Sequence, residues 1–268
     1  MAQESVKQAK RHQEEAAFFD DEKYQEGPLS DLTIRRYKEL RKPWLPSEYA
    51  WFVLGDVRGK RILELGCGDG TNAILLAIKG ASVLGIDISP RAVEVARRRA
   101  RLHGVEDRVQ FVCQDLESVI EGNQETFDII VGFAVLHHVI PVLSNVLQSL
   151  KKLARPDTFF LFAEPVSLSK FLRALRLRLP IPVKGTPGER PLEPEELEII
   201  RRHLPNTRLR LQEFLLRFGR YMLINRNYEL SPWYGRGLYD LAARVDNILL
   251  STLRIKWLAS TAVISGRA

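Results

Sequence analysis

Short apolar segments alternate with helical segments between residues 58 and 163, and this alternation constrains the fold more than any other feature. Strands are expected at 61–65, 81–86, 109–113, 127–133 and 158–163, with helices at 71–79, 89–103 and 142–153. The fourth of these strands is nearly all apolar, as expected of a strand that is covered on both faces. Strands and helices that alternate at this spacing indicate βαβ units. The sequence therefore predicts an α/β fold with a doubly wound, mostly parallel sheet.

The segments on either side of this alternation are expected to complete the same domain. Residues 1–53 are expected to form an N-terminal helical lid or substrate segment, and Ser47 is a suitable N-cap for one of its helices. Residues 54–165 form the expected core, and residues 166–268 supply insertion or cap helices and C-terminal strands. The helices are expected at 31–42, 167–179, 193–203 and within 219–250, and the strands at 207–214 and 259–265.

Composition argues against several classes of protein. No apolar run approaches the roughly 18 to 20 residues that span a bilayer, and the polar N-terminus lacks the apolar core of a signal peptide. A cytoplasmic location is therefore expected. Cys67 and Cys113 are the two cysteines, too few for a disulfide framework or a cysteine-based metal site, and no metal site is expected. The net charge of +7, which includes six arginines in 91–108, is interpreted mainly as solvated helix faces.

A glycine-rich turn follows the first strand. Glycines at positions 66, 68 and 70 permit backbone angles that a side chain forbids, and they let a ligand approach the main chain closely. The helix behind them presents free N–H groups and the positive end of its dipole, which suits an anionic group. Such a turn is a weak signal alone, because nicotinamide and flavin enzymes use a related one.

Three acidic residues stand at the ends of successive strands. Glu64 precedes the first glycine by two positions, and Asp87 ends the second strand, 21 residues after Gly66. A carboxylate in that place reaches ribose hydroxyls from the adjacent strand tip, at the sheet edge where open α/β sheets bind ligands. Asp115 ends the third strand and is expected either to reach an adenine amino group or to cap the turn that follows.

This set of residues closely resembles the class I S-adenosylmethionine (SAM)-dependent methyltransferases. Residues 64–70 match the first motif of that superfamily, and Asp87 and Asp115 match its second and third acidic positions. The sequence Val-Leu-His-His-Val at 135–139 is similar to the "LHH" signature of its small-molecule, ubiquinone-biosynthesis-like branch, and 162–165 resembles the end of that branch's fifth strand.

The resemblance implies a Rossmann-like sheet of about seven strands with an antiparallel C-terminal strand, N-terminal helices and a helical insertion after the fifth strand. It implies SAM as the cofactor, S-adenosylhomocysteine as the product and methyl transfer to a small molecule. The cofactor-binding residues expected from it are Glu64, Gly66, Cys67, Gly68, Gly70, Asp87, Ile88, Asp115, Leu116 and Phe133.

The acceptor is less well defined. An O- or N-acceptor can need a base with a pKa near neutrality, so His137 or His138 is the candidate general base. The alternative is that both histidines are turn residues that line the cofactor pocket. Many aromatic residues and leucines in 10–52 and 166–250 favour O-methylation of an apolar, aromatic or glycosylated metabolite. A lipid or quinone acceptor at a membrane surface and a non-catalytic partner protein of the same fold are the alternatives.

Few macromolecular partners are indicated. The strand at 127–133 is not followed by an Asn-Pro-Pro-Tyr-like sequence and no RNA-binding module is appended, so no nucleic acid is expected. The basic amphipathic helix at 167–179 has the composition of an interfacial helix, which predicts weak contact with anionic membranes and a peripheral position at the inner membrane. The alternative for this helix is a lid over the active site. A monomer or a homodimer is expected.

Overall fold

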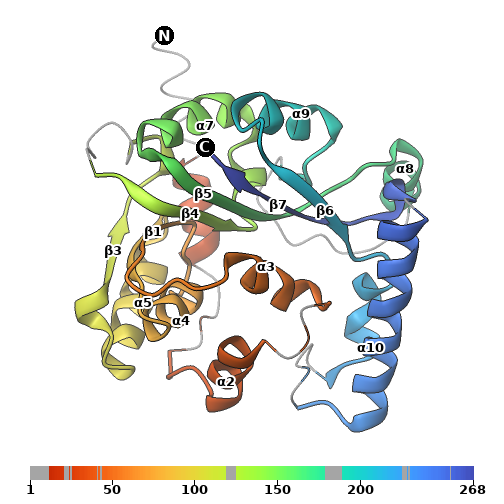
Figure 1. Cartoon of the computed structure of the whole chain (residues 1–268), viewed down its shortest axis with the longest axis horizontal. Helices are drawn as coiled ribbons and strands as arrows, with labels where there is room; N and C mark the ends of the chain where they lie inside the picture. Colours follow the sequence, from red (N-terminus) through yellow and green to blue (C-terminus); the bar gives the residue numbers. More distant parts are fainter. Residues whose placement is uncertain are drawn as a thin grey trace.

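A seven-stranded sheet forms the centre of the computed structural model (Figure 1). The structure describes residues 12–20, 24, 26–40, 42, 44–118, 125–178, 189–224, 228, 230–253 and 255–268. The strands are β1 (Arg61–Leu65), β2 (Ser82–Asp87), β3 (Val109–Cys113), β4 (Phe127–Phe133), β5 (Ala154–Pro165), β6 (Arg208–Gln212) and β7 (Thr261–Arg267). They lie in the order β3-β2-β1-β4-β5-β7-β6.

The direction of the strands confirms the predicted fold class. β1 pairs in parallel with β2 and β4, β2 with β3, and β4 with β5. β7 lies antiparallel to both β5 and β6, which makes it the predicted antiparallel C-terminal strand. The parallel strands therefore all end at one edge of the sheet, and the residues that follow them lie close together there. The boundaries expected for the three sequence segments stay a prediction.

Helices cover both faces of the sheet. They include α2 (Asp31–Glu39), α3 (Pro46–Leu54), α4 (Thr71–Ile78), α5 (Pro90–Leu102), α7 (Leu143–Lys152), α8 (Lys170–Arg178), α9 (Pro194–His203) and α10 (Trp233–Asn247). Residues 12–20 are also helical. Figure 1 shows α7 and α9 on one side of the sheet and α3, α4 and α5 on the other.

The two faces of the sheet have separate apolar cores because side chains alternate along a strand. Leu63 and Ile130 belong to the core under α7 and α9. Their neighbours Ile62 and Ile129 belong to the core under α3, α4 and α5. This alternation is the packing expected of a doubly wound sheet.

Local signals set some helix ends but not others. Ser89 caps α5 by accepting a hydrogen bond from the backbone N–H of Ala92 at 3.0 Å, and Pro90 occupies the first turn, as predicted. The prediction that Ser47 caps a helix was wrong. α3 begins one residue earlier, at Pro46, and its N-cap residue Leu45 makes no side-chain capping bond.

α8 begins the predicted insertion. Leu168, just before α8, and Leu172, within it, pack against the core under α7 and α9, so part of the apolar face of this segment is used inside the protein. Phe171 is 72% exposed. None of the helices among the described residues is long and apolar enough to cross a membrane.

Candidate active site at the ends of the parallel strands

A cavity of about 910 Å³, open mouth included, lies at the edge where β1 to β4 end. Eight of the predicted site residues line it: Gly66, Gly68, Asp87, Ile88, Asp115, Leu116, Phe133 and His138. The other four, which are Glu64, Cys67, Gly70 and His137, are not among the residues that line it. The structure therefore brings most of the predicted residues together around one space.

The glycines after β1 share one backbone requirement and differ in the space around them. All three have positive φ, +62° at Gly66, +51° at Gly68 and +76° at Gly70, where other residues are strained. A Cβ on Gly66 would lie 2.7 Å from Cγ2 of Val135, and one on Gly70 would lie 2.8 Å from Cβ of Ala96. A Cβ on Gly68 would meet no protein atom within 4 Å. Gly68 lines the cavity, so its bare backbone is open to a ligand.

Asp87 ties this turn to the end of β2. Its Oδ2 accepts the backbone N–H of Gly68 at 2.7 Å, and its Oδ1 accepts that of Ser89 at 2.9 Å. Burial raises the pKa of Asp87, and the backbone hydrogen bonds partly oppose that rise. The carboxyl group therefore orders the glycine turn and borders the cavity at the same time.

Glu64 is the most unusual carboxyl group of the site. Its side chain is 1% exposed, and its Oε2 has no hydrogen-bond partner in the described part of the chain. Burial raises the pKa of Glu64 to about 8, and the negative charges of Asp87 and Asp69 act in the same direction. A hydrogen bond with the Asn72 side chain opposes the rise. A buried carboxyl group with an unused oxygen favours a cationic ligand.

Sequence analysis missed the ion pair that holds the glycine turn in place. Arg99 is 3% exposed, and its Nη1 lies 2.6 Å from Oδ2 of Asp69. The same guanidinium donates to the carbonyl of Gly27 at 3.0 Å and to Oγ1 of Thr71 at 3.0 Å. The interpretation of the arginines in 91–108 as solvated was therefore wrong for Arg99. It is buried on the face of α5 that packs against the turn.

Asp115 caps the turn after β3, one of its two predicted roles, and it also lines the cavity. It accepts hydrogen bonds from the backbone N–H of Glu117 at 3.0 Å and of Ser118 at 2.9 Å, and from the Ser118 hydroxyl at 2.6 Å. Burial alone would raise the pKa of Asp115, but the hydrogen bonds from Ser118 and Glu117 and the charge of His12 together outweigh it and the pKa is lowered. The carboxylate is thus charged at neutral pH.

The helix at 12–20 contributes a wall of the cavity that sequence analysis did not locate in detail. His12, Glu15 and Phe19 line the cavity. Asp20 anchors the segment, because the Ser89 hydroxyl donates to its Oδ1 at 2.6 Å and the backbone N–H of Arg91 does so at 3.2 Å. The N-terminal segment therefore rests on the start of α5.

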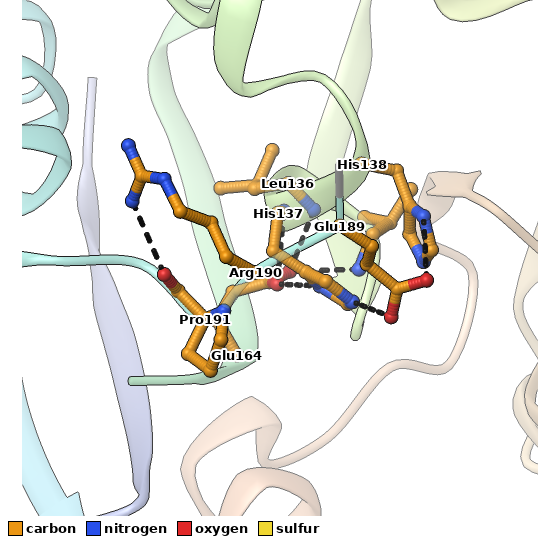
Figure 2. Close-up of polar contacts among 8 residues, drawn as sticks. Leu136, His137, His138, Glu164, Glu189, Arg190 and Pro191 are labelled. Carbon is orange, nitrogen blue, oxygen red and sulfur yellow. Dashed lines mark hydrogen bonds and ion pairs between the residues drawn. The ribbon is translucent and has the colours of Figure 1, made fainter. Parts of the chain in front are cut away.

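The two histidines after β4 have different surroundings (Figure 2). Glu164, which is fully buried at the end of β5, accepts the backbone N–H groups of Val135 and Leu136 at 2.9 Å each. Its other oxygen lies 3.0 Å from Nδ1 of His137, and Nε2 of His137 lies 3.3 Å from Oε1 of Glu189. Both ring nitrogens of His137 therefore face carboxylate oxygens, and its role as a general base stays a prediction.

His138 is the member of the pair that borders the cavity. Its ring packs edge-on against Phe19, with centroids 5.4 Å apart. Burial and the neighbouring His137 lower the pKa of His138 to about 4. For His137, burial lowers the pKa, but the hydrogen bond with Glu164 and the charge of Glu189 outweigh it and the pKa is raised. Neither glutamate was predicted as a site residue.

The sheet order, the glycine turn and the three strand-end carboxyl groups together resemble those of a class I SAM-dependent methyltransferase domain. Residues 56–180 match the family model described as "Methyltransferase domain". Residues 56–180 thus correspond to a methyltransferase domain, which supports the resemblance to this class.

Curated relatives are similar over this domain. The chain is 32% identical over 136 residues to a ubiquinone biosynthesis O-methyltransferase of Neisseria meningitidis, covering 49% of this chain and 56% of the relative. It is 36% identical over 105 residues to one from Vibrio cholerae, covering 39% and 42%. The chain therefore matches about half the length of these relatives or less.

Solved structures share the fold over most of the chain. A geranyl diphosphate C-methyltransferase from Streptomyces coelicolor has a TM-score of 0.57 at 12% identity, covering 96% of this chain and 97% of that one. The [4+2]-cyclase SpnF has a TM-score of 0.53 at 21% identity, covering 82% and 79%. At these identities the likeness shows the fold alone, and one of the two proteins is named for a reaction other than methyl transfer.

Proposed function

We propose that this protein binds SAM in the cavity at the strand ends and transfers its methyl group to a small-molecule acceptor. The observation that carries the proposal is Glu64, a buried carboxyl group whose Oε2 lacks a partner among the described residues. Glu64 does not itself line the cavity, but it stands two residues before Gly66, which does, so the proposal places the ligand's ammonium group at this end of the cavity beside β1. SAM carries an α-ammonium group, which supplies the cation that such a carboxylate needs. The open backbone at Gly68 supports close approach of the same ligand.

The remaining residues fit the other parts of SAM. Asp87 borders the cavity at the tip of β2, where a carboxylate suits a ribose diol. Asp115 and Leu116 border it at the tip of β3, where they suit an adenine ring. A nicotinamide dinucleotide fits less well, because it carries no ammonium group for Glu64.

The other predicted cofactor residues shape the cavity. Ile88 and Phe133 line it directly. Phe133 stacks on Trp51, with ring centroids 6.3 Å apart, and this contact holds the aromatic wall in place. Cys67 and Gly70 do not line the cavity. We propose that they act indirectly, by allowing the glycine turn to pack closely against its neighbours. A Cβ on Gly70 would lie 2.9 Å from the ring of Phe111.

SAM, when bound, supplies a methyl group that its sulfonium already activates. The chain's own contribution is then alignment of the acceptor and exclusion of water. Where the helix at 12–20 faces the segment after β4, Phe19 and Val139 give the cavity an apolar lining. His138 is a polar side chain beside them. We assign acceptor contact to His138, and a positioning role to His137, because the latter is held by Glu164 and Glu189.

The apolar lining favours O-methylation of an aromatic or otherwise apolar acceptor. The curated relatives are named for ubiquinone biosynthesis, which favours a phenolic or quinol-type acceptor within this class. A lipid or quinone acceptor at a membrane surface is the second candidate. It is supported by four exposed residues on α10, which are Trp233, Tyr234, Leu238 and Leu241.

Binding and transfer are tested separately. We expect calorimetry to show binding of SAM and of S-adenosylhomocysteine, and no comparable binding of NADH. Methyl transfer is then measured with labelled SAM against phenols, catechols and quinols with and without apolar tails, and we expect a methylated product. Absence of affinity for both SAM and S-adenosylhomocysteine would refute the proposal. Binding without transfer to any acceptor would favour a non-catalytic partner protein.

A further inference from the structure

Three side chains beside the cavity are placed to hold a metal ion. His137, His138 and Glu189 each present one ligand atom, and these atoms all lie within 4.8 Å of one another. Nε2 of His137 lies 3.3 Å from Oε1 of Glu189, and Nδ1 of His138 lies 3.9 Å from Oε2 of Glu189. Ligands about 2.1 Å from a tetrahedral ion are about 3.4 Å apart. Small movements of the side chains would therefore bring the three atoms into coordination distance.

A buried carboxylate already orients one of these histidines. Oε2 of Glu164 lies 3.0 Å from Nδ1 of His137, which leaves Nε2 directed toward Glu189 (Figure 2). Metal-binding histidines commonly donate their second ring N–H to a carboxylate, which fixes the tautomer and strengthens the ligand. Glu164 is itself held by two backbone N–H groups, so it is a firm support for this arrangement.

The second histidine has an unused ligand atom. Nδ1 of His138 is buried and has no hydrogen-bond partner in the described part of the chain. A buried ring nitrogen without a partner is costly, and coordination to a cation removes that cost. The orphaned atom and the supported His137 are independent observations, and both indicate a ligand at the same point.

We propose that His137, His138 and Glu189 bind a divalent transition-metal ion, with Zn²⁺ as the first ion to test. Two imidazoles and one carboxylate are a donor set that suits such ions, whereas Mg²⁺ and Ca²⁺ prefer oxygen ligands. Three protein ligands leave a coordination position for another molecule. His138 lines the cavity, so a ligand can reach the ion from there.

The proposed metal site also limits the chemical class of the acceptor. This part of the inference rests on the proposed function. A cation beside the cavity would hold a hydroxyl oxygen of the acceptor and lower the pKa of that hydroxyl. The proton of that hydroxyl would then leave to solvent without a histidine base. The oxygen would attack the methyl carbon of SAM while the bond from that carbon to sulfur breaks, and the electron pair would stay on sulfur, so that S-adenosylhomocysteine is the leaving group. Acceptors with a phenol or catechol group are the class that gains most from such a site.

Metal binding is measured on protein without a polyhistidine tag. We expect calorimetry and elemental analysis to show one Zn²⁺ ion per chain for the wild type. His138→Ala and Glu189→Gln should each weaken the affinity about a hundredfold, since each removes a ligand. His203→Ala is the matched control, because His203 pairs with Ser144 and lies outside the cluster. Its affinity for Zn²⁺ should equal that of the wild type.

Further variants separate ligands from supports. Glu164→Gln should weaken Zn²⁺ binding by about 10- to 100-fold, as expected for a residue that orients a metal ligand. Cys113→Ser tests the exposed thiol as the source of binding and should change nothing. Thermal unfolding and binding of S-adenosylhomocysteine show whether each variant is folded.

Two results would overturn the proposal of a metal site. One is a wild-type protein that binds no Zn²⁺ at micromolar concentration. The other is equal affinity in the wild type, His138→Ala and Glu189→Gln. Failure to bind S-adenosylhomocysteine while Zn²⁺ binds would instead overturn the proposed function and leave the metal site standing. Loss of methyl transfer to catechols on chelation, with S-adenosylhomocysteine affinity unchanged, is the result expected for the acceptor role.

Discussion

Replacing Glu64 with glutamine should stabilise the ligand-free protein at alkaline pH while weakening its affinity for SAM. The pKa of Glu64 is raised from 4.5 to about 8, chiefly by burial. A raised carboxyl pKa contributes stability that is fully present below the unfolded value of 4.5 and is lost as the pH rises through about 8. The wild type should therefore lose stability over this pH range, and Glu64→Gln should lose less.

The size of the effect follows from the same pKa shift. One pKa unit corresponds to about 1.4 kcal/mol. We compare the free energies of unfolding of Glu64→Gln and the wild type at about pH 5 and at about pH 8.5. The difference between the two proteins should change by about 4 kcal/mol at most from the lower pH to the higher. Relaxation around the buried site reduces this, and we expect a change of about 2 kcal/mol. Chemical denaturation at both pH values measures it.

Glu48→Gln is the matched control. Glu48 is also buried, at 3% exposure, but its Oε1 accepts a hydrogen bond from Nε of Arg36 at 3.0 Å. Removing that charge should destabilise the protein at both pH values, since it takes away the carboxylate that the half-buried guanidinium of Arg36 contacts. Equal destabilisation of Glu64→Gln at both pH values would contradict the reasoning about Glu64.

Cofactor affinity supplies the second half of this test. A charged hydrogen bond between Glu64 and the ammonium group is worth about 1.5 to 3 kcal/mol, so Glu64→Gln should weaken binding by about 10- to 100-fold. Affinity of the wild type for S-adenosylhomocysteine should rise between about pH 6 and about pH 8, because binding requires the carboxylate. The glutamine variant should show no such rise.

Three further predictions concern the glycine turn, the second strand and α8. Gly66→Ala should destabilise the protein by about 2 kcal/mol or more in denaturation experiments, because of its positive φ and its contact with Val135. Gly68→Ala should destabilise it less but weaken SAM binding at least tenfold by calorimetry; equal effects at the two glycines would count against an open backbone at Gly68. Asp87→Asn should lower SAM affinity by about tenfold or more, as it loses one charged acceptor, and unchanged affinity would exclude a role in binding. Vesicles with anionic lipids should co-sediment the protein at low salt and less so after Phe171→Ala, whereas no co-sedimentation of the wild type would exclude membrane contact.

Sequence patterns predicted the fold where the signals are local. The strand-helix alternation and the Ser89-Pro90 start of α5 depend on neighbouring residues, and both are confirmed. The start of β5 was not predicted, because it depends on distant strands. Ala154 pairs with Phe127 of β4, four residues before the predicted start of the strand. Leu45 carries no capping side chain, and the start of α3 is marked instead by Pro46 in its first position, a signal that sequence analysis did not use.

The residues of the candidate site also divide into those that local sequence signals predict and those that only the fold brings together. Asp87 and the glycines follow strands directly, so their meeting at one sheet edge was predictable. Arg99 and Glu189 were missed for a physical reason. Arg99 stands among other arginines, and only packing distinguishes the buried one. Glu189 is 52 residues away from His137 along the chain, and no periodicity joins such a pair.

The bond between Asp20 and Ser89 links the helix at 12–20 to the start of α5. Shortening the protein at its amino end to isolate the sheet would remove Phe19 and Asp20 with it, and so take away one side of the ligand chamber. Affinities measured on such a shortened protein would understate those of the parent. The helix at 12–20 lies near the amino end of the sequence, but in space it forms part of the binding site.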